Sequence, residues 1–183
     1  AFAARLWWLM RLHGQPAALL DGGFSAWNGA GLDVESGPAQ VEPTPVPAIE
    51  PDMGKVVETS ELESSLADVL LLDARTSDRF RGENEIMDTR AGHIPGTLNL
   101  PFTDCLKEDG TWLDGVSLRQ MLEPLLGDDE SVPWSVMCGS GVTACHLAIS
   151  GLLAGYSEPR VYIGSWSEWI RDPSRAVGSV TAM

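Results

Sequence analysis

The sequence predicts an α/β protein whose parallel sheet is covered by helices on both faces. Short continuous apolar runs at 69–73, 134–137 and 160–163 are typical of strands that are buried on both faces. Segments with apolar residues at helical spacing, at 117–126 and 143–154, alternate with these runs. In such sheets ligands bind at the carboxyl ends of the strands, so we expect the functional residues in the loops that follow the runs.

The other elements between residues 56 and 172 are expected to be shorter. Gly and Pro interrupt the apolar pattern there, and a polar stretch at 81–91 predicts a long loop. We expect helices at 59–66, 74–80 and 165–170, and a small strand at 97–100 that stops at Pro101.

The first 36 residues contain less than a complete domain of this kind. Residues 1–12 have an amphipathic helical pattern, 17–21 read as a short buried strand, and a second helix is expected from Phe24. Residues 19–27 also resemble residues 161–169. We therefore expect 1–36 to be the end of an inactive copy of the same unit, whose beginning lies upstream, and whose restoration would raise stability and activity.

Three further segments complete the predicted organisation. Prolines recur through 37–55, which predicts a linker stiffened by proline. Residues 56–172 alternate strands and helices as one complete domain, and 173–183 form a tail. A chain of 183 residues is long enough for this arrangement.

Composition limits the possible partners. The net charge of −14 argues against binding to nucleic acid or to an anionic membrane surface. No apolar run approaches the length of a transmembrane helix. Three cysteines without paired spacing form no disulfide framework, which favours a reducing, cytoplasmic location. No Cys/His spacing resembles a zinc site, so we expect no metal.

Cys138 occupies the most informative position in the sequence. It follows an apolar run and precedes Gly139-Ser140-Gly141 and a predicted helix. Unpaired N–H groups and the helix dipole at such a place stabilise an anion, and therefore a nucleophilic thiolate. The alternative is a buried cysteine beside an ordinary turn, because most cysteines are small core residues.

Four motifs in order resemble the tandem-domain rhodanese superfamily, and within it the 3-mercaptopyruvate and thiosulfate sulfurtransferases. The resemblance covers residues 55–172, and residues 2–27 resemble the end of the silent first domain. The motifs are Asp73-Ala74-Arg75 with Arg79-Phe80-Arg81-Gly82, then Gly92-His93-Ile94-Pro95-Gly96 to Pro101, then Cys138 to Ala144, then Gly164-Ser165-Trp166-Ser167-Glu168-Trp169.

The resemblance implies transfer of a sulfane sulfur through a persulfide on Cys138. It also implies that the loop binds the persulfide through backbone donors and that no cofactor takes part. The predicted donors belong to Gly139, Gly141, Val142 and Thr143. These residues suit the chemistry, because a glycine-spaced loop at a helix start activates a thiolate and stabilises an anion.

The neutral residues Gly139 and Ser140 favour 3-mercaptopyruvate over thiosulfate as sulfur donor, because family members that use thiosulfate carry basic side chains there. By resemblance Ser140 assists proton transfer, or its hydroxyl shapes the loop by bonding to nearby backbone. Arg79 matches the first arginine that binds the substrate carboxylate, although a surface ion pair is the alternative. Arg90 is the candidate for the second arginine, in a loop shorter than the family pattern.

Three other functions are alternatives to transfer of sulfur from 3-mercaptopyruvate. A cysteine-dependent phosphatase needs an arginine six positions after the cysteine, where Ala144 stands. A thiosulfate:cyanide sulfurtransferase and a non-catalytic binding module stay open, although the second kind usually lacks the cysteine. The expected sulfur acceptors are a small thiol, a thiol protein such as thioredoxin, or cyanide.

Overall fold

A parallel sheet of five strands lies at the centre of the computed structural model, which describes residues 1–38, 42–43 and 50–178. Its strand order is β1-β5-β4-β2-β3, so the chain crosses over between neighbouring strands. Val136 pairs with Leu72 on one side and with Val161 on the other, which makes β4 the central strand. The strands are β1 (Val56–Val57), β2 (Leu71–Asp73), β3 (Leu98–Asn99), β4 (Ser135–Met137) and β5 (Arg160–Tyr162).

Seven α-helices connect or flank these strands in the described residues, and each predicted helix is found within a few residues of its expected place. Among the described residues, no helix combines the length and the apolar character that crossing a bilayer requires. The α-helices are α1 (Phe2–Leu12), α2 (Gly23–Gly29), α3 (Thr59–Ser65), α4 (Ser77–Arg81), α5 (Gly115–Leu126), α6 (Val142–Leu153) and α7 (Ser165–Trp169), with 3₁₀ turns η1 (Met53–Lys55) and η2 (Phe102–Cys105).

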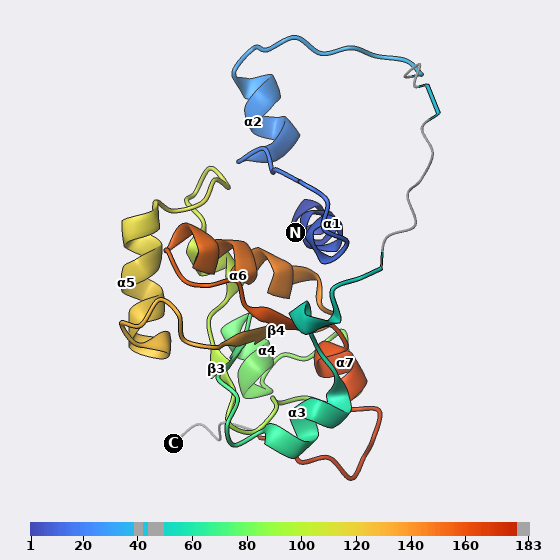
Figure 1. The fold of residues 1–183 in the computed structure, drawn as a ribbon, viewed down its shortest axis with the longest axis vertical. Coiled ribbons are helices and arrows are strands. Elements are labelled where there is room, and N and C mark those ends of the chain that lie inside the picture. The colour runs from blue at the N-terminus through green and yellow to red at the C-terminus, as the bar shows by residue number, and fades with distance from the viewer. Residues whose placement is uncertain (39–41, 44–49, 179–183) are drawn as a thin grey trace.

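The sheet separates two apolar cores, as expected for an α/β protein. Successive strand residues point to opposite faces, so Leu72 and Val136 join the core under α1, α5 and α6. Leu71 and Met137 join the smaller core under α3 and α7. In Figure 1 the two groups of helices lie on opposite sides of β4. The predicted fold class is therefore confirmed.

Helix α1 packs directly on α6, next to the sheet. Its buried residues Ala4, Trp8 and Leu12 belong to the same core as the central strand. Every residue from Ala144 to Gly151 of α6 is buried, because α1 and α5 cover it from two sides. The first helix is thus part of the main core of the described structure. Whether 1–36 derive from a separate domain stays a prediction.

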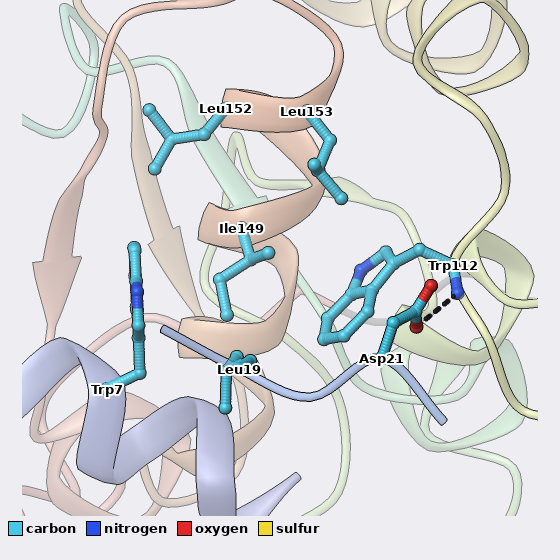
Figure 2. A pocket seen from close by; sticks show the side chains of 7 residues that line it. All are labelled: Trp7, Leu19, Asp21, Trp112, Ile149, Leu152 and Leu153. Carbon is cyan, nitrogen blue, oxygen red and sulfur yellow. Dashed lines mark hydrogen bonds between the residues drawn. The ribbon is translucent and has the colours of Figure 1, made fainter. Parts of the chain in front are cut away.

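The expected strand at 17–21 is absent. These residues belong to no helix or strand and pair with no strand of the described structure. Instead, Leu19 and Asp21 line an apolar pocket of about 290 Å³ beside α6, together with Trp112 (Figure 2). Asp21 Oδ1 accepts the backbone N–H of Trp112 at 3.0 Å. The apolar run was misread because packing on a helix and burial in a sheet require similar side chains.

Strand β1 was not predicted, because two residues are too few to show a periodicity.

Both ends of the predicted domain are held by backbone hydrogen bonds to distant parts of the chain. At the end of the predicted linker, the N–H of Asp52 bonds to the carbonyl of Leu12 at 2.7 Å. Gly178 in the predicted tail pairs with His93 through two backbone hydrogen bonds of 2.9 Å. Residues 39–41 and 44–49 of the linker and 179–183 of the tail lie outside the described residues.

Candidate active site

Cys138 lies directly after β4, at the carboxyl end of the central strand and before α6. It is only 2% exposed. Its N–H donates to the Ser165 hydroxyl at 3.1 Å, and its carbonyl accepts the N–H of Trp166 at 3.0 Å. These bonds join the first turn of α7 to the residue that follows β4, and so fix the position of Cys138.

Ser165 has the only positive φ of a non-glycine residue in the described structure, at 54°. A serine in this conformation costs free energy of about 1–3 kcal/mol, which the surrounding contacts must offset. The side chain is completely buried and donates to the Tyr162 carbonyl at 2.8 Å. It thereby links the end of β5 to Cys138 of the neighbouring strand. We did not predict this role from the sequence, although Ser165 lies within a recognised motif.

The five residues after Cys138 present a run of free backbone donors. We call residues 139–143 the cysteine loop. Within the described part of the chain, none of its N–H groups donates to a hydrogen-bond acceptor. The last two belong to Val142 and Thr143, which begin α6 and have no partner inside the helix. Consecutive free N–H groups at a helix start suit an anion, and binding of one by this loop stays a prediction.

Two carbonyl groups of the same loop, those of Gly139 and Gly141, are by contrast bonded. The carbonyl of Gly139 accepts the N–H of Ser167 at 2.9 Å and lies 2.7 Å from its hydroxyl. The carbonyl of Gly141 accepts Arg5 Nη1 and Cys145 Sγ, each at 3.3 Å. Because the carbonyls are held by neighbouring elements, the orientation of the loop peptides is fixed and their N–H groups stay available.

Gly141 is required by its conformation and by its surroundings. Its φ of +75° is disfavoured for residues with a Cβ. A Cβ at this position would also lie 2.6 Å from the carbonyl oxygen of Ile163, which is backbone and cannot turn away. A Cβ on Gly139 would instead meet the Arg79 guanidinium at 3.5 Å, an ordinary contact distance.

Arg79 lies beside the cysteine loop, close to Gly139. Its Nε and Nη2 bond to Glu85 at 2.8–3.1 Å, and Nη2 also bonds to Asp88 at 3.1 Å. In the described residues Nη1 makes no hydrogen bond, and it lies 3.6 Å from the place of a Cβ on Gly139. Arg79 is therefore held by two carboxylates and keeps one free donor group at the loop.

Glu85 is the anchor of this arrangement. Its side chain is 2% exposed and also contacts Arg75, which itself forms a buried bidentate pair with Asp73. Burial opposes ionisation, but hydrogen bonds from Arg79 and from the N–H groups of Met87 and Asp88 outweigh it. The pKa of Glu85 is therefore below its ordinary value.

Asp88 connects Arg79 to the other side of the loop. One carboxylate oxygen contacts Arg79, and the other lies 2.7 Å from the Ser167 hydroxyl, which also lies 2.7 Å from the Gly139 carbonyl. Neither Asp88 nor Ser167 was predicted from the sequence. Ser167 lies within the last motif, between two tryptophans that are buried in the core.

The remaining predicted site residues lie in different places. Ser140 is exposed, and its hydroxyl makes no hydrogen bond to the described residues, so nothing there supports the alternative of a hydroxyl bonded to nearby backbone. Val142 and Thr143 are half-buried at the start of α6. Arg90 donates to the backbone carbonyl of Arg175 at 3.2 Å, and among the described residues it makes no hydrogen bond to the cysteine loop. Its role as a second substrate arginine stays a prediction without support from these contacts.

The other two cysteines are buried in the core. Cys145 lies one turn into α6, and burial raises its pKa to about 11. Burial also raises the pKa of Cys105. Neither thiol is therefore a ready nucleophile near neutral pH.

The fold and site define an α/β domain that places a cysteine at the carboxyl end of its central parallel strand. A loop of free N–H donors follows this cysteine directly. The model of the rhodanese-like domain matches residues 58–172, and the chain belongs to this family. The confirmed resemblance extends beyond the matched domain, because the relatives align with the first helix as well.

Two curated relatives and one solved structure illustrate the similarity. A probable 3-mercaptopyruvate sulfurtransferase of Pseudomonas aeruginosa is 45% identical over 98% of this chain and 64% of its own length. A putative thiosulfate sulfurtransferase, SseB, of Mycobacterium tuberculosis is 37% identical over 100% and 64%. The structure of 3-mercaptopyruvate sulfurtransferase from Leishmania major has a TM-score of 0.79 at 32% identity, over 93% of this chain and 49% of that one. The chain thus spans less than two-thirds of the length of these relatives.

Proposed function

We propose that this chain transfers a sulfane sulfur from 3-mercaptopyruvate to a thiol or cyanide through a persulfide on Cys138. The observation that supports this best is the set of free N–H groups in the cysteine loop, directly after a buried cysteine. Such donors stabilise both the thiolate that attacks and the anionic persulfide that results. A purely structural cysteine would not need a loop in which the Gly139 and Gly141 carbonyls are bonded while the N–H groups are left free.

In the first step, the Cys138 thiolate attacks the sulfur of 3-mercaptopyruvate. A sulfur–sulfur bond forms while the bond from that sulfur to carbon breaks, and the electron pair leaves on carbon as the enolate of pyruvate. The enolate takes up a proton, and the persulfide loses its proton to the loop environment or solvent. The exposed Ser140 hydroxyl, two residues from the sulfur in sequence, is the candidate to carry a proton.

In the second step, an acceptor thiolate attacks the outer sulfur of the persulfide. The new bond joins acceptor and sulfur, the sulfur–sulfur bond breaks, and its electron pair returns to Cys138 as a thiolate. Cyanide accepts the sulfur in the same way and leaves as thiocyanate. A small thiol or a thiol protein such as thioredoxin fits the same step, and neither requires a cofactor.

Donor choice depends on the side chains around the cysteine loop. Arg79 offers its free Nη1 to one carboxylate, while Gly139 and Ser140 bring no positive charge. The carboxylate of Asp88 also lies beside the loop, which disfavours a dianion such as thiosulfate. The named activity of the Pseudomonas relative supports 3-mercaptopyruvate, and that of the mycobacterial relative keeps thiosulfate as the alternative.

The experiment compares two products of the purified chain. With cyanide as acceptor, we expect pyruvate from 3-mercaptopyruvate at least about tenfold faster than sulfite from thiosulfate, because one carboxylate matches the single arginine. Cys138→Ser should abolish both, and Cys105→Ser, which changes a buried thiol outside the loop, should retain transfer. Faster release of sulfite would overturn the donor, and full activity in C138S would overturn the mechanism.

A further inference from the structure

Arg5 of α1 contacts Gly141 of the cysteine loop, which lies 136 positions later in the sequence. Its Nη1 donates to the Gly141 carbonyl at 3.3 Å and lies 3.9 Å from Cys145 Sγ. Its guanidinium carbon lies 5.0 Å from the centre of the Trp8 ring, and Trp8 itself is completely buried. The side chain is thus directed by packing within α1 toward the start of α6.

The hydrogen bond from Arg5 acts on the peptide group that joins Gly141 and Val142. The Gly141 carbonyl and the Val142 N–H belong to one trans peptide, so they point in opposite directions. Arg5 occupies the carbonyl side. On the other side, the Val142 N–H has no acceptor among the described residues. A donor on the carbonyl therefore fixes the direction of this N–H and also polarises it.

We propose that Arg5 is a positioning residue for sulfur transfer, which holds the Val142 N–H toward the thiolate and the persulfide of Cys138. This inference rests on the proposed function of the same loop. Arg5 does not touch the sulfur of Cys138 in the structure. It acts through the Gly141–Val142 peptide, and through its positive charge near the helix start.

The charge of Arg5 is available for this role. Within the described part of the chain no carboxylate pairs with it, whereas Arg79 is paired with Glu85 and Asp88. Among the described residues, the ionisable side chains found beside the cysteine loop are Arg79 and Asp88 at Gly139, and Arg5 and Cys145 at Gly141. Removing the charge of Arg5 changes only one of these four.

Arg11 provides a matched control on the same helix. Its guanidinium carbon also lies 5.0 Å from a tryptophan ring, that of Trp7. However, it pairs with Glu158 at 2.8 Å and has no bond to the cysteine loop. Arg11→Gln therefore removes the same charge from α1 without removing a bond to Gly141.

The test is the pH profile of alkylation of Cys138 by iodoacetamide, located by mass spectrometry, in the full chain. R5Q and R5M both remove the charge, and R5M keeps an apolar side chain on Trp8. R5K keeps a positive charge at this position. We expect R5Q and R5M to shift the profile to higher pH and to slow alkylation near neutral pH by about 3- to 10-fold. R5K should recover part of the loss. R11Q loses its pair with Glu158, but Ala4, Trp8 and Leu12 still pack α1 on α6, so its folded fraction should show the profile of the unaltered protein.

Circular dichroism establishes the folded fraction of each protein, and either neutral variant that folds decides the question. A profile of folded R5Q or R5M that overlaps with that of R11Q would overturn the proposal. Pyruvate release from 3-mercaptopyruvate is measured in parallel. If the unaltered chain releases none, the proposed function fails, while the alkylation profile still decides the role of Arg5.

Discussion

Arg79 is held by carboxylates with which the carboxylate of a sulfur donor must compete. Glu85 binds it through both Nε and Nη2 and is almost completely buried, so this contact fixes the guanidinium. Asp88 binds only Nη2 and is more exposed, at 12%. The second contact is therefore the weaker one, and it sets how readily an anion approaches the cysteine loop.

At this scale Asp88→Asn should strengthen the binding of donors. The amide keeps a hydrogen-bonding group for Ser167 but removes the negative charge beside Arg79. We expect the KM for 3-mercaptopyruvate to fall about threefold, and that for thiosulfate to fall further, because the repulsion of a dianion is larger. Steady-state kinetics with both donors measures the effect.

Glu83→Gln serves as control for this variant. Glu83 lies in the same loop as Asp88, but it pairs with Arg81 on the surface. Glu83→Gln therefore removes an equal charge at a place away from the cysteine loop. An equal change of KM in both variants would show that general charge, and not Asp88, sets the binding of donors.

Local motifs predicted the part of the site that is close together in sequence. The cysteine loop and Arg79 could be recognised because the chemistry of each depends on neighbouring residues. Arg5, Asp88 and Ser167 could not, since they reach Gly139 or Gly141 only when separate elements pack together. Their residue types are common on protein surfaces, and only the folded chain distinguishes them.

At the scale of elements, α1 is joined to the loop through its packing on α6. Trp8 is completely buried in the main core, and its Nε1 has no partner among the described residues. The indole therefore contributes mainly through apolar burial and by supporting Arg5. An amphipathic helix such as α1 was predictable from its periodicity, whereas the two-residue β1 was not.

Trp8→Ala should destabilise the whole described domain. Truncating a buried tryptophan costs about 3–5 kcal/mol, through lost burial and the cavity that remains. The measurement is denaturant unfolding followed by circular dichroism, together with sulfur transfer under conditions where the variant is folded. We expect transfer to fall as well, because Arg5 loses its support.

Trp27→Ala is the comparison, since this tryptophan lies on α2 and is 37% exposed. It should cost less than about 1 kcal/mol, as surface changes usually do. If W8A left the unfolding of the rest of the chain unchanged, α1 would be a separate unit and not part of the core.

At the scale of the whole molecule, Glu158 ties three distant segments together. Its carboxylate pairs with Arg11 of α1 at 2.8 Å and with Lys55 of η1 at 2.7 Å. It precedes β5, so these bonds hold both α1 and the end of the predicted linker against the sheet. In a chain with a net charge of −14, two cations on one half-buried carboxylate also reduce local repulsion.

Glu158 should make the stability of the chain depend on pH in the acid range. The hydrogen bond from Arg11, opposed by burial and aided by Lys55, lowers the pKa of Glu158 from its ordinary value of 4.5. A carboxyl group whose pKa is lowered by folding stabilises the folded state at any pH above the pKa that the group has in the unfolded state. This contribution is lost as pH falls through the lower value of the folded state.

The expected result is that Glu158→Gln lowers the free energy of unfolding by about 1–2 kcal/mol near neutral pH, as for other charged hydrogen bonds that are partly buried. The difference from the unaltered protein should shrink as pH falls below the ordinary pKa of 4.5, and it should vanish below the lower pKa of the folded state, where Glu158 is protonated in both states. Denaturant unfolding at several pH values measures it, with Glu123→Gln as control, because Glu123 is 52% exposed in its pair with Arg119. A difference that stays constant down to pH 2 would mean that Glu158 acts through packing, and that charge does not hold α1 and η1 to the sheet.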